Sequence, residues 1–183
     1  MGPDAKEARA AQIADAAYEI LSDKGFGGLS MLAVAKRAKA SNETLYRWYG
    51  DKTGLFRALI QRNAGLVEER LDAGGYADLT ELGEALLAML LSPRAVALNR
   101  AAAADASDQL GAALAQEGRG RVFPKVASEV GRLAPGVSVD LWFGLLVGDW
   151  QIRCATGAMP LPDEAARRVR AVSAADLAER LAE

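Results

Sequence analysis

The stretch that decides the fold is Ala40–Lys52, which reads ASNETLYRWYGDK. Ser41 is placed to cap a helix that runs to about Tyr49, because a serine hydroxyl accepts a hydrogen bond from a free amide of the first turn. Leu45 and Tyr49 lie four positions apart and therefore share one helical face. The segment predicts a short helix that these two side chains anchor, with aromatic and basic side chains crowded around residues 46–48.

The residues before this helix predict two more. SMLAVAKRA, residues 30–38, predicts a short helix that Ser30 caps, and the tight turn KAS follows it. Asp4–Lys24 predicts a long first helix, for which Gly25 supplies a stop. Two short helices joined by a turn of three or four residues are typical of a helix-turn-helix unit.

The rest of the chain also predicts helices, since it is rich in Ala, Leu, Glu and Arg and has no long alternating pattern. Asp51 is placed to cap a fourth helix, from Lys52 to about Leu71. Further helices are expected near 79–91, 93–106, 108–133, 139–157 and 163–181, with Ser92, Ser138 or Asp140, and Asp163 as caps, and with Pro124 kinking or splitting the third of these. We therefore predict an all-α chain, with a helix-turn-helix domain over residues 1–51 and a larger helical domain over residues 52–183.

The charge is distributed unevenly. The chain of 183 residues carries a formal net charge of −2, yet residues 25–52 hold five lysines and arginines against two acidic residues. A basic segment in a mildly acidic chain is typical of a nucleic-acid-binding domain on a neutral or acidic body. A solvated cluster of charges would give the same count.

Composition excludes several kinds of site. The sequence contains no histidine and one cysteine, Cys154, so zinc sites, Ser-His-Asp triads and Cys-His pairs are excluded as usually built. Catalysis by carboxylates or lysine stays open. No metal and no cofactor are predicted. The polar start, residues 1–10, has no signal-peptide pattern, and the apolar run at 141–148 is too short to span a bilayer, so we expect a cytoplasmic protein without a membrane partner.

The polar side of the third helix suits a duplex. Asn42 and Glu43 lie in the first turn, the part of a recognition helix that reaches base edges, where Asn binds adenine and Glu accepts from cytosine. Thr44, Arg47 and the Tyr46 hydroxyl, together with Lys52, can donate to phosphates. Ordinary packing is the alternative for Tyr46 and Trp48.

TLYRWYGDKTGLF resembles the recognition-helix signature of the TetR family of bacterial transcriptional repressors, and the resemblance extends over about residues 9–60. The match implies base-facing roles for Asn42, Glu43 and Tyr46 and phosphate-facing roles for Thr44, Arg47, Trp48 and Lys52; with the capping Ser41, these form the predicted DNA-binding set. The turn position that usually holds glycine is Lys39. A positive φ there would cost about 1 kcal/mol.

The apolar helix expected near 139–154 predicts a second copy of the chain as a partner, because one layer of helices cannot bury it on every side. The resemblance likewise implies a dimer built on the last two helices. The predicted interface comprises Leu141, Gly144, Leu145, Gly148, Ile152, Val169 and Val172. The alternative is that the glycines relieve crowding inside the monomer. Two related recognition helices would read a palindrome with half-sites about 34–36 Å apart.

Large side chains on otherwise small-residue helices, and polar residues beside them, predict a ligand pocket. The candidates are Met89, Asn99, Phe123, Trp142, Phe143, Leu146 and Trp150. Core filling is the alternative for each. The resemblance implies a small-molecule effector that weakens binding to operator DNA.

Together these patterns predict a dimeric, ligand-responsive transcriptional repressor that binds palindromic operator DNA and is not an enzyme. Two other hypotheses stay open. One is a helical protein-interaction module that binds no DNA, and the other is a small all-α enzyme. The missing histidine argues against the enzyme.

Overall fold

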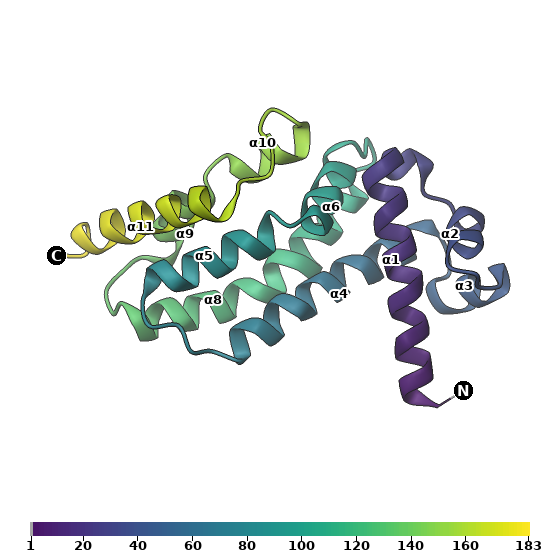
Figure 1. Cartoon of the computed structure of the whole chain (residues 1–183), viewed down its shortest axis with the longest axis horizontal. Coiled ribbons are helices and arrows are strands. Elements are labelled where there is room, and N and C mark those ends of the chain that lie inside the picture. Colours follow the sequence, from purple (N-terminus) through teal and green to yellow (C-terminus); the bar gives the residue numbers. More distant parts are fainter. Residues whose placement is uncertain (1) are drawn as a thin grey trace.

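The structure is a computed structural model that describes residues 2–183, and across this range it contains helices and loops but no strand (Figure 1). The predicted all-α class is confirmed. The helices are α1 Pro3–Gly28, α2 Met31–Arg37, α3 Asn42–Tyr49, α4 Lys52–Asp72, α5 Leu79–Leu90, α6 Pro93–Ala103, α7 Gln109–Ala113, the π-helical turn η1 Leu114–Arg119, α8 Gly120–Leu133, α9 Val139–Val147, α10 Trp150–Thr156 and α11 Glu164–Arg180.

Side-chain caps set where most helices begin. At each predicted cap, a serine or aspartate oxygen accepts a hydrogen bond from the amide three residues later, at 2.7–3.4 Å. The confirmed caps are Ser30, Ser41, Asp51, Ser92, Ser138 and Asp163. Asp78 caps α5 in the same way. Each cap satisfies an amide that has no partner within the helix. Because the two residues are three positions apart, the start of each helix can be predicted from the local sequence.

Gly25 bends the first helix instead of ending it. Its backbone has φ 62° and ψ −171°, and helical geometry resumes beyond it to Gly28. Phe26, just after the bend, packs edge-on against Phe56 of α4, with ring centroids 5.5 Å apart. The predicted stop is therefore a kink that turns one aromatic ring into the core.

The helix expected over 108–133 is split, as Pro124 suggested, but the break lies before the proline. Residues Leu114–Arg119 form a π-helical turn, and the Gly120 amide donates to the carbonyl of Ala115 five residues earlier. Pro124 itself lies inside α8. A proline lacks the amide and crowds the preceding turn, and a wide turn upstream accommodates this strain.

The prediction of a single helix over 139–157 is also wrong, because two helices occupy this range. Gly148 has φ 48° and ψ −129°, and α9 ends there before α10 begins. A Cβ at Gly148 would overlap the Arg170 guanidinium. The backbone turn at Gly148 therefore favours glycine, because an L side chain rarely adopts this positive φ. The Arg170 guanidinium occupies the space beside it.

Two apolar clusters organise the molecule. The first draws on α1, α2, α3, the first half of α4 and parts of α6 and α7. The second draws on the later half of α4 and on α5, α8, α9 and α11. Figure 1 shows α4 running from the end occupied by α2 and α3 into the layer of α5 and α8. Helix α4 thus joins the two clusters, and the domain boundary at residue 52 stays a prediction.

Candidate nucleic-acid interface and ligand cavity

Helix α3 is anchored from beneath and open above. Leu45 is fully buried in the first cluster, and Tyr49 packs against the same cluster half-buried. Burial raises the pKa of the Tyr49 phenol above its ordinary value. Asn42, Glu43 and Arg47 are exposed, and Tyr46 keeps 52% of its surface accessible. The helix therefore presents one polar face outward, on a rigid support.

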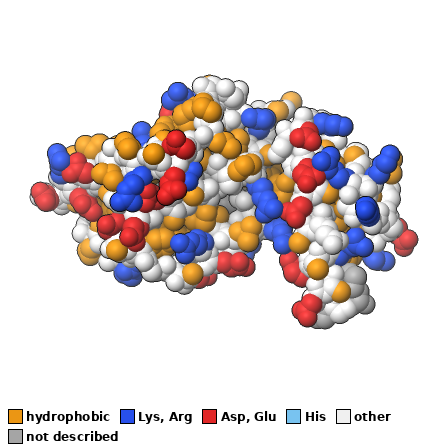
Figure 2. Space-filling model, viewed as in Figure 1, with side chains coloured by type: hydrophobic (Ala, Val, Ile, Leu, Met, Phe, Trp, Pro, Cys, Tyr) orange, Lys and Arg blue, Asp and Glu red, His pale blue; other side chains and the backbone are white. Residues whose placement is uncertain are grey.

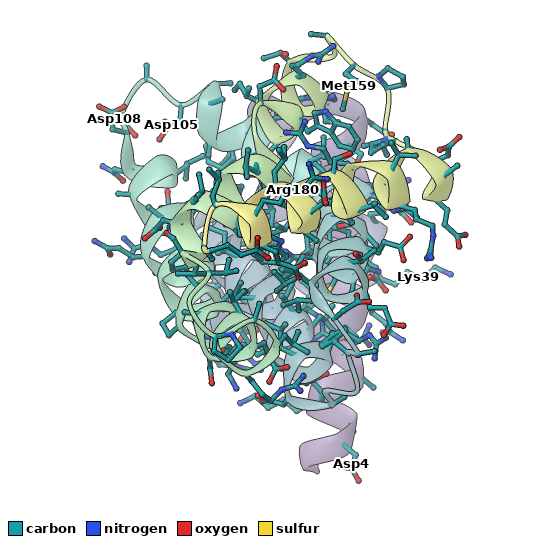
Figure 3. The ribbon with its side chains drawn as sticks, turned by 90° about the vertical axis from the view of Figure 1, so that its left-hand side faces the viewer. Asp4, Lys39, Asp105, Asp108, Met159 and Arg180 are labelled. Atoms are coloured by element: carbon teal, nitrogen blue, oxygen red, sulfur yellow. The ribbon has the colours of Figure 1, made fainter. Side chains whose placement is uncertain are left out.

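The turn between α2 and α3 is strained at one residue. Lys39 adopts φ 51°, the left-handed region that glycine favours, at a cost of about 1 kcal/mol for a side chain with a Cβ. The next amide, of Ala40, donates to the Ala35 carbonyl at 2.9 Å and closes the turn. Figure 3 shows the Lys39 side chain projecting from the edge of the molecule. This geometry fixes the angle between α2 and α3.

Two predicted contact residues already have partners within α3. The Ser41 hydroxyl accepts from the Thr44 amide at 3.0 Å and lies 2.8 Å from the Thr44 hydroxyl. These bonds hold the first turn of α3, the turn that carries Asn42 and Glu43. Ser41 and Thr44 therefore position the outward side chains as well as lying beside them.

Trp48 and Lys52 flank the outward face. Trp48 is half-buried, its ring packs edge-on against Tyr49, and the Lys6 ammonium lies 5.8 Å from its centroid. The Lys52 ammonium lies 3.8 Å from the Phe26 ring centroid, and burial lowers its pKa. The cation–π contact shortens the reach of Lys52, so it presents charge beside the start of α4.

The end of the molecule around α2 and α3 is basic. Lys36, Lys39 and Arg47 are exposed there, and Figure 2 shows lysine and arginine side chains gathered at this end. Arg37 differs, since its Nε lies 2.5 Å from a Glu19 carboxylate oxygen. The cations left open give this face a positive potential that attracts a polyanion.

A cavity of about 300 Å³ lies in the body, next to the second half of α4. Its walls come from every helix between α4 and α10, and most of them are aliphatic or aromatic. Of the seven predicted pocket residues, Asn99, Phe123 and Phe143 line this cavity. The mixture of an apolar wall with a few polar groups is typical of a small-molecule site.

The other four predicted pocket residues do not line it. Trp142 and Leu146 are fully buried in the second cluster, because successive residues of α9 point about 100° apart and only Phe143 turns toward α8. The Trp150 ring faces the Arg170 guanidinium at 5.3 Å. Met89 packs against the second cluster.

Sequence reasoning missed the walls that α4 and the π-helical turn contribute. From α4 come Ile60, Asn63, Ala64 and Val67, and from the π-turn come Leu114, Gly118 and Arg119. One signal was available. Glycines at 111, 118 and 120, followed by Pro124, are too many helix breakers for one regular helix.

The predicted interface residues lie on α9, α10 and α11 and are mostly exposed. Leu141, Ile152 and Val172 are exposed, and Val169 keeps 68% of its surface accessible. Gly144 is exposed with no atom within 4 Å of where a Cβ would lie, whereas Leu145 is half-buried. Exposed aliphatic side chains on adjoining helices are typical of protein-binding surfaces, and the interface itself stays a prediction.

Polar contacts tie the N-terminal helices to the body. Glu117 in the π-helical turn accepts from the Gln61 amide at 2.7 Å and lies 3.8 Å from the Arg57 guanidinium, and both partners are on α4. Nearer the head, the Tyr18 hydroxyl of α1 donates to the Leu59 carbonyl at 2.7 Å, where burial raises the pKa of Tyr18 to about 12. The wall of the cavity is thus bonded to the helix that supports α3.

Within residues 2–183, no cluster of three His, Cys, Asp or Glu side chains is placed to hold a metal ion. No helix in the same range is long and apolar enough to cross a membrane.

Comparison with known proteins agrees with this geometry. The family described as "Bacterial regulatory proteins, tetR family" matches residues 13–59. The HTH-type transcriptional regulator YvkB of Bacillus subtilis (strain 168), itself uncharacterized, is 33% identical over 79 residues. That alignment covers 42% of this chain and 42% of YvkB, so the chain matches less than half the length of this relative.

Solved structures resemble the whole chain. A TetR-family transcriptional regulator of Mesorhizobium loti MAFF303099 superposes with a TM-score of 0.80 at 22% identity, covering 99% of this chain and 98% of that one. A TetR transcriptional regulator of Agrobacterium tumefaciens has a TM-score of 0.69 at 26% identity, covering 97% and 95%. The likeness therefore extends beyond the N-terminal helices to the fold of the body.

Proposed function

Because this chain belongs to the TetR family of bacterial regulatory proteins, we propose that it is a homodimeric transcriptional repressor, released from operator DNA by a small molecule. The observation that carries the proposal is helix α3. Buried Leu45 packs this helix onto the core, and Ser41 caps its first turn. Its polar face is exposed to solvent at the basic end of the molecule. A helix held in this way fits the major groove.

In the proposed complex, Asn42, Glu43 and Tyr46 face the base edges. Arg47, Lys52 and the amides that begin α4 face the phosphates, because a helix N-terminus and a guanidinium both bind anions. Glu43 lies in the first turn, beside the exposed Asn42, where a carboxylate accepts from the amino group of cytosine and repels phosphate. Glu43 therefore acts on sequence preference more than on affinity.

The second copy of the chain covers the exposed aliphatic face of α9 and α11. One eight-residue helix reads few base pairs, and a twofold pair reads two half-sites about 34–36 Å apart. The exposure of Val169 and Val172 supports this partner, because a dimer would remove these side chains from water. The position of both residues on α11 fits a symmetric contact between identical surfaces.

The cavity is where the effector acts. A ligand held between α4 and the π-helical turn contacts Ile60 and Gly118, and the neighbouring Glu117 is bonded to Gln61 and paired with Arg57 on α4. Displacement of the turn therefore displaces α4, whose first residues support α3. The ligand shifts the balance between the two arrangements by the difference in its affinity for them.

DNA binding by the full chain tests the proposal. A labelled fragment from the DNA that flanks the gene is titrated with protein, against a fragment of unrelated sequence. We expect the flanking fragment to bind more tightly, with log K falling steeply as log salt rises, because phosphate contacts release counterions.

Two arginine variants provide the matched comparison. Arg47→Ala should weaken binding and reduce the salt slope by about 1, whereas Arg180→Ala, which removes an exposed arginine from the far end of the body, should bind like the parent. A parent protein that binds both fragments equally, with a flat salt dependence, would instead favour a helical interaction module.

A further inference from the structure

The cavity wall carries one charged side chain, and it is a cation. Among the residues that line the cavity, Asn63, Asn99, Arg119 and Gln151 are polar, and no acidic residue is present. All the other lining residues are apolar or glycine. The charge of the site therefore favours an anion over a cation.

Arg119 is held at the edge of the cavity by its aromatic walls. Its guanidinium carbon lies 4.0 Å from the Phe123 ring centroid and 5.5 Å from that of Phe143. The two rings pack edge-on against each other, with centroids 5.4 Å apart. This stacking orients the planar guanidinium before any ligand arrives, which lowers the entropy lost on binding.

The hydrogen-bonding capacity of Arg119 is largely free. Its ion-pair partner within residues 2–183 is Asp140, at a nitrogen–oxygen distance of 3.8 Å, which is longer than a hydrogen bond. The side chains are 54% and 78% exposed, so solvent weakens this pair further. A carboxylate that accepts two hydrogen bonds from the same guanidinium is a better partner than Asp140.

The size and the exposure of the site define the rest of the ligand. A volume of about 300 Å³ lies at the lower end of the range for small-molecule sites, so the cavity admits a small ligand. Aliphatic walls from α4, α5 and α8 enclose the apolar part, while the half-exposed Arg119 leaves a charged group in contact with water. An anion at this position avoids full desolvation.

We propose that the effector is a small apolar monocarboxylate, and that Arg119 selects it by a forked hydrogen bond while its tail fills the cavity. The proposal rests on the proposed function in taking this cavity as the effector site. Straight-chain and aromatic acids share the required chemistry. The amides of Asn63 and Gln151 add neutral polar contacts, and Arg119 supplies the discrimination by charge.

Calorimetric titration of the full chain at neutral pH tests the proposal with four probes: octanoate, 3-phenylpropanoate, 1-octanol and octylamine. We expect octanoate to bind at least about tenfold more tightly than octanol, because the charged hydrogen bond is lost in the alcohol. Octylamine, protonated at this pH, should bind weakest. The ratio of octanoate to 3-phenylpropanoate separates straight-chain from aromatic acids.

Variants assign the preference to one side chain. Arg119→Met keeps the apolar stem and should bind octanoate and octanol within about twofold of each other, since the forked donor is absent. Lys125→Met removes an equal charge from the following helix α8, outside the cavity, and should keep the preference of the parent. Asp140→Asn removes the competing carboxylate and should tighten octanoate binding. Equal affinity of the parent for octanoate and octanol, or a preference that survives in Arg119→Met, overturns the proposal.

DNA binding, measured in parallel, separates this proposal from the proposed function. Selective DNA binding without any preference for octanoate would reject the ligand class and leave the repressor standing. If the protein prefers octanoate through Arg119 but does not bind DNA selectively, the result would support the carboxylate site and reject the proposed repressor function. Release of DNA by octanoate in the parent, but not in Arg119→Met, is the expected result.

Discussion

In the N-terminal head, residues 2–51, the core is filled and the outward face of α3 is polar. The body, residues 52–183, instead contains a cavity and exposes aliphatic side chains along α9 and α11. Val34 and Leu45 are fully buried in the head. In the body, a cavity of about 300 Å³ remains open while Val169 stays 68% exposed. The body thus departs from ordinary packing twice, once inside and once at its surface.

This difference in packing fits different proposed roles for the two regions. A filled core gives the head one arrangement, which suits a surface that must match a fixed duplex. In the proposed repressor, the cavity of the body takes up the ligand, and its exposed aliphatic face binds the second copy of the chain. The following variants test this comparison.

The largest effect is expected from a leucine truncation in each region. Leu45→Ala should destabilise the protein by about 3 kcal/mol or more, because the filled head cannot collapse around the void. Leu114→Ala, in the half-buried wall of the cavity, should cost only about 1 kcal/mol, because that side chain already borders empty space. Urea unfolding measures both. Equal costs would mean that the head is packed no better than the body.

The contact between the two regions should weaken in alkali. Burial raises the pKa of Tyr18 to about 12, above the value of about 10 in the unfolded chain. The folded state then holds its proton where the unfolded state loses it, so this contribution is complete below pH 10 and declines as the pH rises toward 12. The full loss, above both pKa values, amounts to about 3 kcal/mol.

Urea unfolding at pH 8 and pH 11 measures this decline. Tyr18→Phe serves as the control, because it lacks the ionisable group and should lose less stability between the two pH values. If the variant and the parent lose stability in parallel, other groups cause the alkaline effect and the Tyr18 contact contributes little to it.

Relief of the strained turn should stabilise the head. Lys39→Gly removes the Cβ from a residue with φ 51° and should gain about 0.5–1 kcal/mol. Lys36→Gly, in α2, should lose a similar amount, because glycine is unfavourable within a helix. Thermal unfolding measures the change in stability of both variants. If the changes have opposite signs, the strain lies at the Lys39 backbone, since the two exposed lysines are only three residues apart. If both variants lose stability, the backbone at Lys39 is not strained.

The smallest effect concerns Glu117. Glu117→Gln keeps an acceptor for Gln61 and removes only the charge that faces Arg57 at 3.8 Å. A double-mutant cycle with Arg57→Gln should give a coupling of about 0.2–0.5 kcal/mol, as expected for an exposed ion pair. A coupling near zero would leave the Gln61 hydrogen bond as the link between the π-helical turn and α4.

The sequence predicted some features of the fold closely because they depend on neighbouring residues. Ser30, Ser41 and Asp163 each cap a helix with a hydrogen bond to an amide three residues away, and such a contact can be read from the residues themselves. The burial of Leu45 follows from a spacing of four in the same way. Base contacts and phosphate contacts stay predictions.

The cavity could not be predicted as well because it depends on long-range packing. Phe143 lines it and the adjacent Trp142 does not, although both are large aromatic residues on one apolar helix. Which of them faces the cavity is set by the rotation of α9 against α5 and α11. The break at Gly148 was missed for a similar reason, since the Arg170 guanidinium that occupies the space comes from a distant helix.

The segment Leu114–Arg119 has a consequence for how this chain tolerates a change in length. A π-helical turn accommodates one residue more than an α-helical turn does, so deletion of a single residue here would let the chain run as continuous α-helix from Gln109 to Leu133. One residue corresponds to about 100° of rotation and about 1.5 Å of rise. The present π-helical form and the continuous α-helical form would therefore differ by one residue in register. Arg119, the last residue of the π-helical turn, lies where the two forms would part.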